Sequence, residues 1–475
     1  MTEPKDFSST PSTQNDQNKS FSKLADQEQE QINELITKLQ AFTFKGSEIA
    51  SLIDSVMSTD LKKQHSGLVG LKKFLSQPQG SPIEEVLDSG VVPRLLEIME
   101  DSIEPQIQLD AAWCLVTLCS GTPEQTQQVV DCGMIPIFLS ALDSAGFKVT
   151  QQILWGLGKI AESSAAFRDL IIKEGGVEII VNVVEDALTL GSKRNGAWAL
   201  SNLCKGKPAP PFGSISGALP AFCNLLKNEN HQEILTYAAW GLFYSSGRKE
   251  GIEMILQSDV ISAIVGFLSS PILSIVTPCL KIVGNIIAGT DKQTSMVLKE
   301  KDFLPGLLNL TSHESKAIRK EAFWIASNLT SGTPAQVESI MGNPAFVERI
   351  IDAAKNDADE IRREAVYALT NSTRAGTSAQ IKRLLTYGVF QCLIEVLGEV
   401  EDAKILLEVL DSIEDCIKWG KVLNLVDEKG QSKFLLEFEN HGGSAKIEQL
   451  QKHPNKEVHK RACVIIETYL DNFFQ

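Results

Sequence analysis

The chain has 475 residues, of which 43% are hydrophobic and 22% are charged, and this composition excludes a wholly disordered or fibrous protein. Its formal net charge of −15 argues against nucleic-acid binding, which requires a basic surface, and favours a basic partner. The most apolar stretch, residues 260–276, is interrupted by Pro271 and several serines. We therefore expect no membrane span and place the protein in the cytoplasm and nucleus.

The first 45 residues are polar and hold seven acidic residues, five lysines and no arginine; the first arginine of the chain is Arg94. Such a segment buries too little apolar surface to offset the entropy lost on ordering. We therefore expect residues 1–46 to be a disordered or partly helical polar segment, in which residues 26–42 are the part that could form a helix.

Beyond residue 50 a pattern of about 42 residues repeats. Its anchors are large side chains in apolar helical runs: Trp113, Trp155, Trp198, Trp240, Lys281, Trp324, Tyr367 and Asp411. Their successive spacings are 42, 43, 42, 41, 43, 43 and 44 residues. Eight anchors at this spacing indicate a helical repeat of the armadillo or HEAT kind.

Residues 122–163 show how one repeat is built. A short helix begins near Pro123 and ends at Gly133, a second covers "MIPIFLSALDS", and a third covers "FKVTQQILWGLGKIAES" and carries the anchor. A glycine follows the first helix in several repeats: Gly90, Gly133, Gly175 and Gly388. The sequence predicts an all-α fold, a right-handed superhelical armadillo solenoid of about ten three-helix repeats. It would cover residues 47–470 and leave a tail of residues 471–475.

Four anchors are followed by an asparagine four residues later, on the same helix face: Asn202, Asn285, Asn328 and Asn371. In a solenoid such residues form rows along the concave surface, where an asparagine amide pairs with the backbone of an extended peptide. Tryptophan faces hold lysine or arginine side chains, each contact contributing roughly 0.5–2 kcal/mol. The pattern therefore predicts a basic peptide ligand. The alternative, that the tryptophans are simply buried between repeats, predicts no asparagine at this offset.

The motifs "WALSNLCKGKPAPP", "TPCLKIVGNIIAGTDKQT", "KEAFWIASNLTSGT" and "VIIETYL" resemble the importin-α (karyopherin-α) family, and the resemblance covers roughly residues 60–472. It implies a nuclear import adaptor that binds lysine- or arginine-rich nuclear localisation signals of cargo proteins. It implies a major signal site at Trp113, Gly121, Thr126, Gln152, Trp155, Trp198 and Asn202. It implies a minor site at Lys281, Asn285, Thr294, Trp324, Asn328, Glu364, Tyr367 and Asn371.

The major site departs from the family pattern, because Thr117 and Lys159 replace two asparagines, and Ser163 and Tyr237 replace two acidic residues. A lysine beside a peptide cation costs roughly 0.7–3 kcal/mol at about 6 Å, and each lost asparagine contact about 1 kcal/mol. We therefore expect repeats 6–8 to supply most of the affinity. In the alternative, Lys159 turns outward and pairs with a glutamate three residues later.

The resemblance also bears on partners. The family's usual arginine- and lysine-dense segment, which binds importin-β and folds back as a cargo mimic, is not recognisable here. We therefore expect neither the usual importin-β contact nor autoinhibition. A nuclear export receptor for importin-α is a further partner that the resemblance implies. A second hypothesis is an armadillo scaffold or regulatory paralogue that has lost general import activity.

Catalytic and metal-binding signatures are missing from the sequence. The six histidines show no metal-ligand spacing, and no glycine-rich phosphate loop follows a strand. The nine cysteines form no Cys-x-x-Cys pair, and most lie in apolar helical runs, among them Cys114, Cys119, Cys204 and Cys279. We expect no enzyme activity and no cofactor, and we expect these thiols to be reduced and buried.

Overall fold

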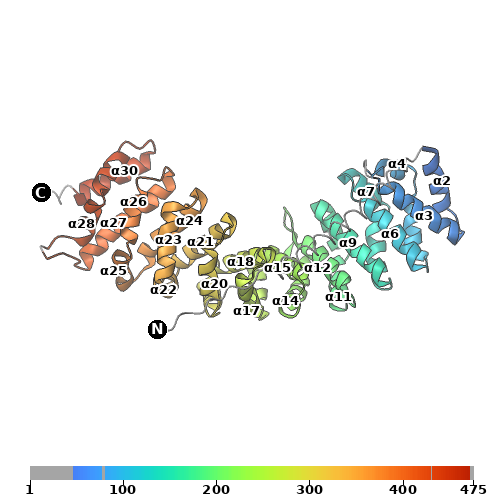
Figure 1. The fold of residues 1–475 in the computed structure, drawn as a ribbon, viewed down its shortest axis with the longest axis horizontal. Coiled ribbons are helices and arrows are strands. Elements are labelled where there is room, and N and C mark those ends of the chain that lie inside the picture. Colours follow the sequence, from blue (N-terminus) through green and yellow to red (C-terminus); the bar gives the residue numbers. More distant parts are fainter. Residues whose placement is uncertain (1–45, 78–80, 429, 471–475) are drawn as a thin grey trace, which may run out of the picture. The chain divides into compact units, whose positions relative to one another are not determined.

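The computed structural model describes residues 46–77, 81–428 and 430–470, and these form stacked helices (Figure 1). In the described residues the only β pairing is an isolated bridge between Val426 and Ser432. The prediction of an all-α armadillo solenoid is confirmed. The helix considered for residues 26–42 and the tail at 471–475 lie outside the described residues, so the boundaries given for the repeat domain stay predictions.

The chain divides into two compact units, of which unit 1 ends at Ala199 and unit 2 begins at Leu200. Unit 1 holds α2 (Gly46–Val56), α3 (Leu61–Leu75), α4 (Ile83–Asp88), α5 (Val92–Asp101), α6 (Pro105–Leu118), α7 (Pro123–Asp131), α8 (Met134–Ala141), α9 (Phe147–Ser163), α10 (Ala165–Lys173), α11 (Gly176–Glu185) and most of α12 (Leu190–Cys204). From α4 onward the helices come in threes, as the sequence predicts.

Unit 2 continues the same order. It holds the end of α12, then α13 (Phe212–Ile215), α14 (Ala218–Asn228), α15 (Gln232–Ser246), α16 (Lys249–Gln257), α17 (Ile261–Gly266), the 3-10 helix η1 (Phe267–Ser269), α18 (Leu273–Ile287), α19 (Asp291–Leu298), α20 (Phe303–Leu310), α21 (Lys316–Thr330), α22 (Pro334–Met341), α23 (Pro344–Asn356), α24 (Asp359–Ala375), α25 (Ser378–Thr386), α26 (Val389–Val396), α27 (Ala403–Val422), α28 (Lys433–Asn440), α29 (Gly443–Leu450), α30 (Lys456–Ile465) and the π-helix η2 (Ile466–Leu470).

The first helix of several repeats begins with the same local signal, a threonine followed three residues later by a glutamine. In each case the threonine hydroxyl accepts from the glutamine backbone N–H, and the glutamine side chain accepts from the threonine backbone N–H. These reciprocal caps occur at Thr122, Thr290, Thr333 and Thr377. Each satisfies two backbone donors and contributes about 1 kcal/mol, so the sequence fixes where these helices start.

Glycine shapes the bend between the first and second helices. Gly133, Gly175 and Gly388 cap the second helix with φ values of 93°, 80° and 74°, which only glycine adopts without strain. Gly90 has a φ of 71°, and Gly442, which the sequence reading missed, has the same role with a φ of 68°.

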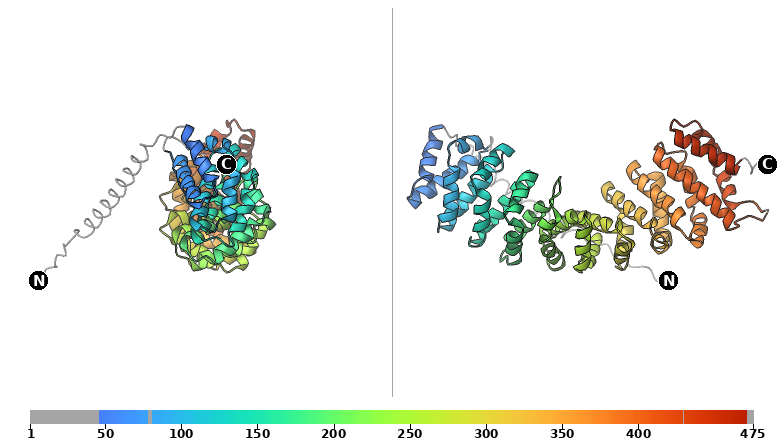
Figure 2. Two further views of the ribbon diagram at one scale, coloured as in Figure 1. Left: turned by 90° about the vertical axis from the view of Figure 1, so that its right-hand side faces the viewer. Right: turned by 180° about the vertical axis from the view of Figure 1, so that it is seen from behind.

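Third helices of successive repeats pack side by side within each unit (Figures 1 and 2). In unit 1 this row contains α3, α6 and α9, and in unit 2 it runs from α15 through α18, α21, α24 and α27 to α30. The core lies between the rows and the second helices, where Phe138, Phe303 and Phe390 are fully buried. Equivalent positions of the third helices therefore repeat along one surface of each unit.

The nine cysteines are all free thiols. Seven are buried, including the four that the sequence places in apolar helices, and only Cys132 is exposed. Burial raises the pKa of the Cys119 and Cys392 thiols to about 12, so both stay protonated and unreactive at neutral pH.

In the described chain no single helix has the length and apolar character needed to cross a membrane. One pair, Lys249–Gln257 and Ile261–Ser269, passes the same test of length and composition when taken together, but it is bent by 95°.

Candidate peptide-binding surface

The aromatic anchors lie on the third helices, and none of them is fully buried. Trp113, Trp198, Trp240, Trp324 and Tyr367 are half-buried, and Trp155 on α9 is 36% exposed. The opposite side of each helix packs into the core, as Leu154 and Leu157 do beside Trp155. The aromatic anchors thus pack partly between repeats and keep part of their surface exposed.

At the first anchor, Trp113 on α6, the protein supplies a cation of its own. The ammonium group of Lys72 on α3 lies 5.6 Å from the centre of the Trp113 ring and 2.6 Å from the Asp110 carboxylate, which is buried. Four residues beyond Trp113, the Thr117 hydroxyl donates to the Trp113 carbonyl at 2.8 Å. This hydroxyl is engaged with its own helix and does not replace an asparagine amide.

The Trp198 ring has a similar arrangement with α9. It lies so close to Gly158 that a Cβ atom there would be 2.5 Å from Trp198 Cζ3. The Lys159 ammonium group is 5.8 Å from the Trp198 ring centre and 3.2 Å from the Glu162 carboxylate. The pairing of Lys159 with Glu162, which is the alternative to a lysine in the peptide groove, is thus present, and Lys159 also stays beside the aromatic face.

The other predicted residues of the major site differ in accessibility. Gly121 is exposed after the end of α6, whereas Asn202, in unit 2, is buried. Gln152, half-buried on α9, has a side-chain amide nitrogen that is buried without a hydrogen-bond partner among the described residues. An unsatisfied buried donor is costly, so this amide is a group that a ligand or water would satisfy.

Two predicted site threonines do not face the ligand surface. Thr126 and Thr294 are 1% and 4% exposed, and each hydroxyl donates at 3.1 Å to a backbone carbonyl at the end of the preceding third helix. The acceptors are Cys119 and Ile287. Both threonines therefore hold the first helix of a repeat against the third helix before it.

In unit 2 two successive repeats carry both the aromatic ring and the asparagine. Trp324 and Tyr367 stand on the adjacent helices α21 and α24, with Asn328 and Asn371 one turn further along each helix. Asn328 donates to the Trp324 carbonyl at 3.0 Å, and Asn371 donates to the Ser327 carbonyl of the preceding repeat at 3.0 Å. Asn285 donates to the Ser246 hydroxyl at 2.8 Å. All three side chains are half-buried.

The Trp324 and Tyr367 rings have no internal lysine or arginine over them among the described residues. In the part of the chain that the structure describes, cation–aromatic contacts involve Trp113, Trp198, Phe243 and Tyr469, and none involves Trp324 or Tyr367. The Trp324 ring is held as Trp198 is, since a Cβ atom on Gly284 would lie 2.5 Å from Trp324 Cζ3.

Acidic side chains accompany this surface at a fixed offset. Glu321, Glu364 and Glu408 each precede an anchor by three residues, on α21, α24 and α27. Glu364 is half-buried, and burial raises the pKa of its carboxyl group above the usual value. Sequence reasoning found Glu364 through the family resemblance but missed Glu321 and Glu408, although the shared offset of three residues was a signal for both.

Next to this surface, Lys281 takes the aromatic position of its repeat. Its ammonium group lies 2.9 Å from Glu321 and 5.8 Å from the Phe243 ring centre. In the preceding repeat Trp240 packs against Phe243 at 5.4 Å and stacks on Tyr244 at 5.7 Å between ring centres. Tyr244 stands where four of the repeats have asparagine, so this repeat offers aromatic surface in place of an amide.

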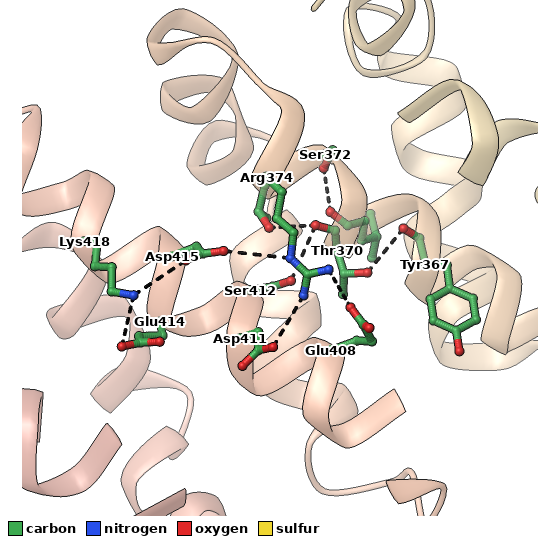
Figure 3. A network of polar contacts seen from close by, with 12 residues as sticks. Tyr367, Thr370, Ser372, Arg374, Glu408, Asp411, Ser412, Glu414, Asp415 and Lys418 are labelled. Atoms are coloured by element: carbon green, nitrogen blue, oxygen red, sulfur yellow. Dashed lines mark hydrogen bonds and ion pairs between the residues drawn. The ribbon is translucent and has the colours of Figure 1, made fainter. Parts of the chain in front are cut away.

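Beyond Tyr367 the row ends in charged residues (Figure 3). The Arg374 guanidinium group lies between three carboxylates of α27, at 2.7 Å from Glu408, 3.7 Å from Asp411 and 3.9 Å from Asp415. Lys418 lies on the far side of Asp415, at 3.9 Å. The carboxylates at the last anchor therefore already hold an internal cation, and the open part of the surface ends at Tyr367 and Asn371.

Metal-ligating side chains do not gather anywhere in the described residues: no group of three or more His, Cys, Asp or Glu residues could hold a metal ion.

The fold and this surface define an armadillo-repeat protein, and comparisons with known proteins agree. The model for the armadillo/β-catenin-like repeat matches residues 81–120 and 122–162, and the model for an atypical Arm repeat matches residues 432–472. A crystal structure of an engineered protein has a TM-score of 0.74 with 22% identity, covering 88% of this chain and 98% of that chain, which shows the shared fold alone.

Relatives across most of the chain are importin α subunits. Importin subunit alpha-1b of Oryza sativa subsp. japonica is 37% identical over 437 residues, 92% of this chain and 81% of the relative. Importin subunit alpha-2 of Arabidopsis thaliana is 38% identical over 427 residues, 90% of this chain and 79% of the relative. Importin subunit alpha-B of Dictyostelium discoideum is 36% identical over 428 residues, which are 90% of this chain and 82% of the relative. The chain belongs to the importin α family.

Proposed function

We propose that the protein is a nuclear import adaptor that binds lysine- or arginine-rich nuclear localisation signals of cargo proteins, moving between cytoplasm and nucleus. Family membership supports the adaptor role. The observation that carries the binding site is the pairing of open aromatic faces with asparagines on α21 and α24, next to Glu321 and Glu364. In this arrangement the asparagine amides bind the peptide backbone, and the aromatic rings and carboxylates bind its cationic side chains.

Within this proposal, the unit 2 surface (Trp324, Tyr367, Asn285, Asn328 and Asn371) supplies most of the affinity. Each asparagine uses an amide N–H within the protein, while its carbonyl oxygen accepts from no donor among the described residues. That oxygen is free to accept from a peptide N–H. The unit 1 surface (Trp113, Trp155 and Trp198) already holds Lys72 and Lys159 on two of its three rings, so a peptide lysine meets a resident cation there.

A direct test is titration of a fluorescein-labelled lysine-rich peptide against the full chain, followed by fluorescence anisotropy at low and moderate salt. We expect saturable binding that weakens with salt, because charges supply part of the affinity. A matched peptide with every lysine replaced by alanine is the control and should not bind. Binding no tighter than about millimolar, which corresponds to about −4 kcal/mol, would contradict the adaptor role.

The second candidate is a scaffold that retained the solenoid and lost general import activity. The resident cations favour it: Lys72, Lys159, Lys281 and Arg374 occupy positions on the third-helix rows that peptide cations would otherwise take. The same titration separates the two candidates, since a scaffold would not bind the lysine-rich peptide in a saturable way.

A further inference from the structure

Lys159 and Glu162 form a salt bridge on α9 beside the Trp198 ring, in a position open to solvent. Their charged groups are 3.2 Å apart and each side chain is 40% exposed. The Lys159 ammonium group also lies 5.8 Å from the Trp198 ring centre, within the range of an attractive cation–π contact. The aromatic face therefore holds a lysine supplied by the protein itself.

The chain contains a matched version of this pocket without the lysine. Gly284 and Trp324 in unit 2 stand in the same relation as Gly158 and Trp198 in unit 1, because an added Cβ atom would lie 2.5 Å from ring atom Cζ3 in both places. The residue after the glycine is Asn285 in unit 2 and Lys159 in unit 1. The position next to the ring thus carries a positive charge in unit 1 and an amide in unit 2, where the lysine of the helix, Lys281, stands one turn earlier and pairs with Glu321.

The charge has only one acidic neighbour on the two helices that build the unit 1 pocket. Glu162 is the only Asp or Glu residue in α9 and α12, and Glu321, which lies 2.9 Å from Lys281, is the only one in the matching helices α18 and α21 of unit 2. Since Glu162 is already paired with Lys159, a peptide lysine entering here would meet a cation and find no free carboxylate on either helix.

We propose that the Trp155–Trp198 part of unit 1 binds basic peptides that carry an acidic residue next to a lysine, in preference to an unbroken run of lysines. This inference rests on the proposed function, because it names the ligand class of one part of that surface. The peptide carboxylate forms a salt bridge with Lys159, and Glu162 then forms one with the neighbouring peptide lysine. Both charges of the Lys159–Glu162 salt bridge thereby find partners of opposite charge in the ligand.

The test uses a five-lysine peptide between Gly-Ser flanks, labelled with fluorescein, and five variants of it in which one lysine at a time is replaced by glutamate. The scan removes the need to know in which register the peptide binds. The protein is the full chain carrying Trp324→Ala and Asn328→Ala, so that binding at unit 2 does not mask unit 1. It is compared with the same protein carrying Lys159→Asn, the residue that the chain itself uses in the matched pocket.

We expect at least one glutamate-containing peptide to bind the Lys159 protein as tightly as the five-lysine peptide, or more tightly. With Lys159→Asn the same peptide should bind about tenfold more weakly than the five-lysine peptide, the effect of one charge at about 6 Å. Lys159→Arg should restore the preference, because it keeps the charge. Glu162→Gln should keep the preference for the acidic residue, because it leaves the Lys159 charge in place.

A glutamate penalty of equal size in the Lys159 and Lys159→Asn proteins would overturn the inference. So would failure of both proteins to bind any of the peptides, provided that circular dichroism shows them folded. The proposed function has its own test in both cases: the chain without substitutions in unit 2 should still bind the five-lysine peptide.

Discussion

Asn371 donates a hydrogen bond to the backbone carbonyl of Ser327, 44 residues earlier, at 3.0 Å. The bond joins the third helices α24 and α21 at the point where the open surface lies, and it orients the asparagine amide so that its carbonyl oxygen has no partner among the described residues. A side chain fixed in this way needs little further ordering when it accepts a hydrogen bond from a peptide.

Asn371→Ala should therefore weaken binding of a lysine-rich peptide by about fivefold to tenfold, the effect of one lost hydrogen bond of about 1 kcal/mol. Fluorescence anisotropy measures the affinity. The control is Asn356→Ala, which changes an exposed asparagine on the second helix α23 and should leave the affinity unchanged. Equal affinities for the two variants would argue that Asn371 does not contact the peptide.

Glu364 makes the affinity dependent on pH. Burial raises the pKa of its carboxyl group, and a bound peptide cation favours the ionised form, so affinity is highest above this pKa and is lost as pH falls through it. Folding responds in the opposite direction, since a raised folded-state pKa adds stability when the carboxyl group is protonated. Protonation of Glu364 therefore does not by itself destabilise the fold while it weakens binding.

The corresponding measurement is the peptide dissociation constant between about pH 7.5 and about pH 5, a range in which lysine does not titrate. The decline in affinity should be smaller in Glu364→Gln than in the natural chain. If both proteins show the same pH dependence, Glu364 does not face the bound cation.

The anchor spacing and the caps made much of the fold predictable. The bounds of α9 are those expected from "FKVTQQILWGLGKIAES", because a glycine precedes the helix and its apolar side chains recur at helical spacing. By contrast, α13 has only four residues and follows a stretch with three prolines. Proline lacks a backbone N–H and interrupts helices, so the sequence gives no periodic pattern from which this helix could be predicted.

Contacts between repeats at the candidate site were harder to predict. Lys72 reaches Asp110, 38 residues later, and Lys281 reaches Glu321, 40 residues later. Such pairs depend on how far one third helix is shifted along the next. This shift is determined by packing in the core and cannot be read from the spacing of the anchors alone. For the same reason the sequence did not reveal that Thr126 points into the protein.

Arg374 stabilises the last part of the described solenoid, because it lies between three carboxylates of α27 (Figure 3). Arg374→Gln should destabilise unit 2 by about 0.5–1 kcal/mol at neutral pH, since the residues are partly exposed. The loss should shrink as pH falls, because a protonated carboxyl group no longer attracts the guanidinium group in the natural chain. Thermal unfolding at two pH values measures this.

The matched control for Arg374→Gln is Lys249→Gln, which removes a single salt bridge of 3.9 Å between strongly exposed residues. It should leave the unfolding temperature unchanged at both pH values. An effect of Arg374→Gln that is no larger than that of the control would show that the network contributes nothing measurable.

Residues 1–45 should not compete for the peptide surface. They carry five lysines and seven acidic residues, a net charge of −2, whereas a cargo mimic needs consecutive basic side chains. Deleting them should leave the affinity for a lysine-rich peptide unchanged within about twofold, because dispersed charges in a polar segment interact weakly with the surface. A tenfold gain in affinity on deletion would mean that the segment occupies the site.

The central claim is that the unit 2 surface supplies most of the affinity, and a comparison of two double variants tests it most directly. Trp324→Ala with Asn328→Ala removes an open ring and its asparagine, whereas Trp155→Ala with Trp198→Ala removes two rings of the unit 1 surface. Titrated with the same lysine-rich peptide, the unit 2 variant should bind at least about tenfold more weakly than the natural chain, the sum of about one cation–π contact and one hydrogen bond. The unit 1 variant should lose about threefold or less. A larger loss in the unit 1 variant would contradict the account.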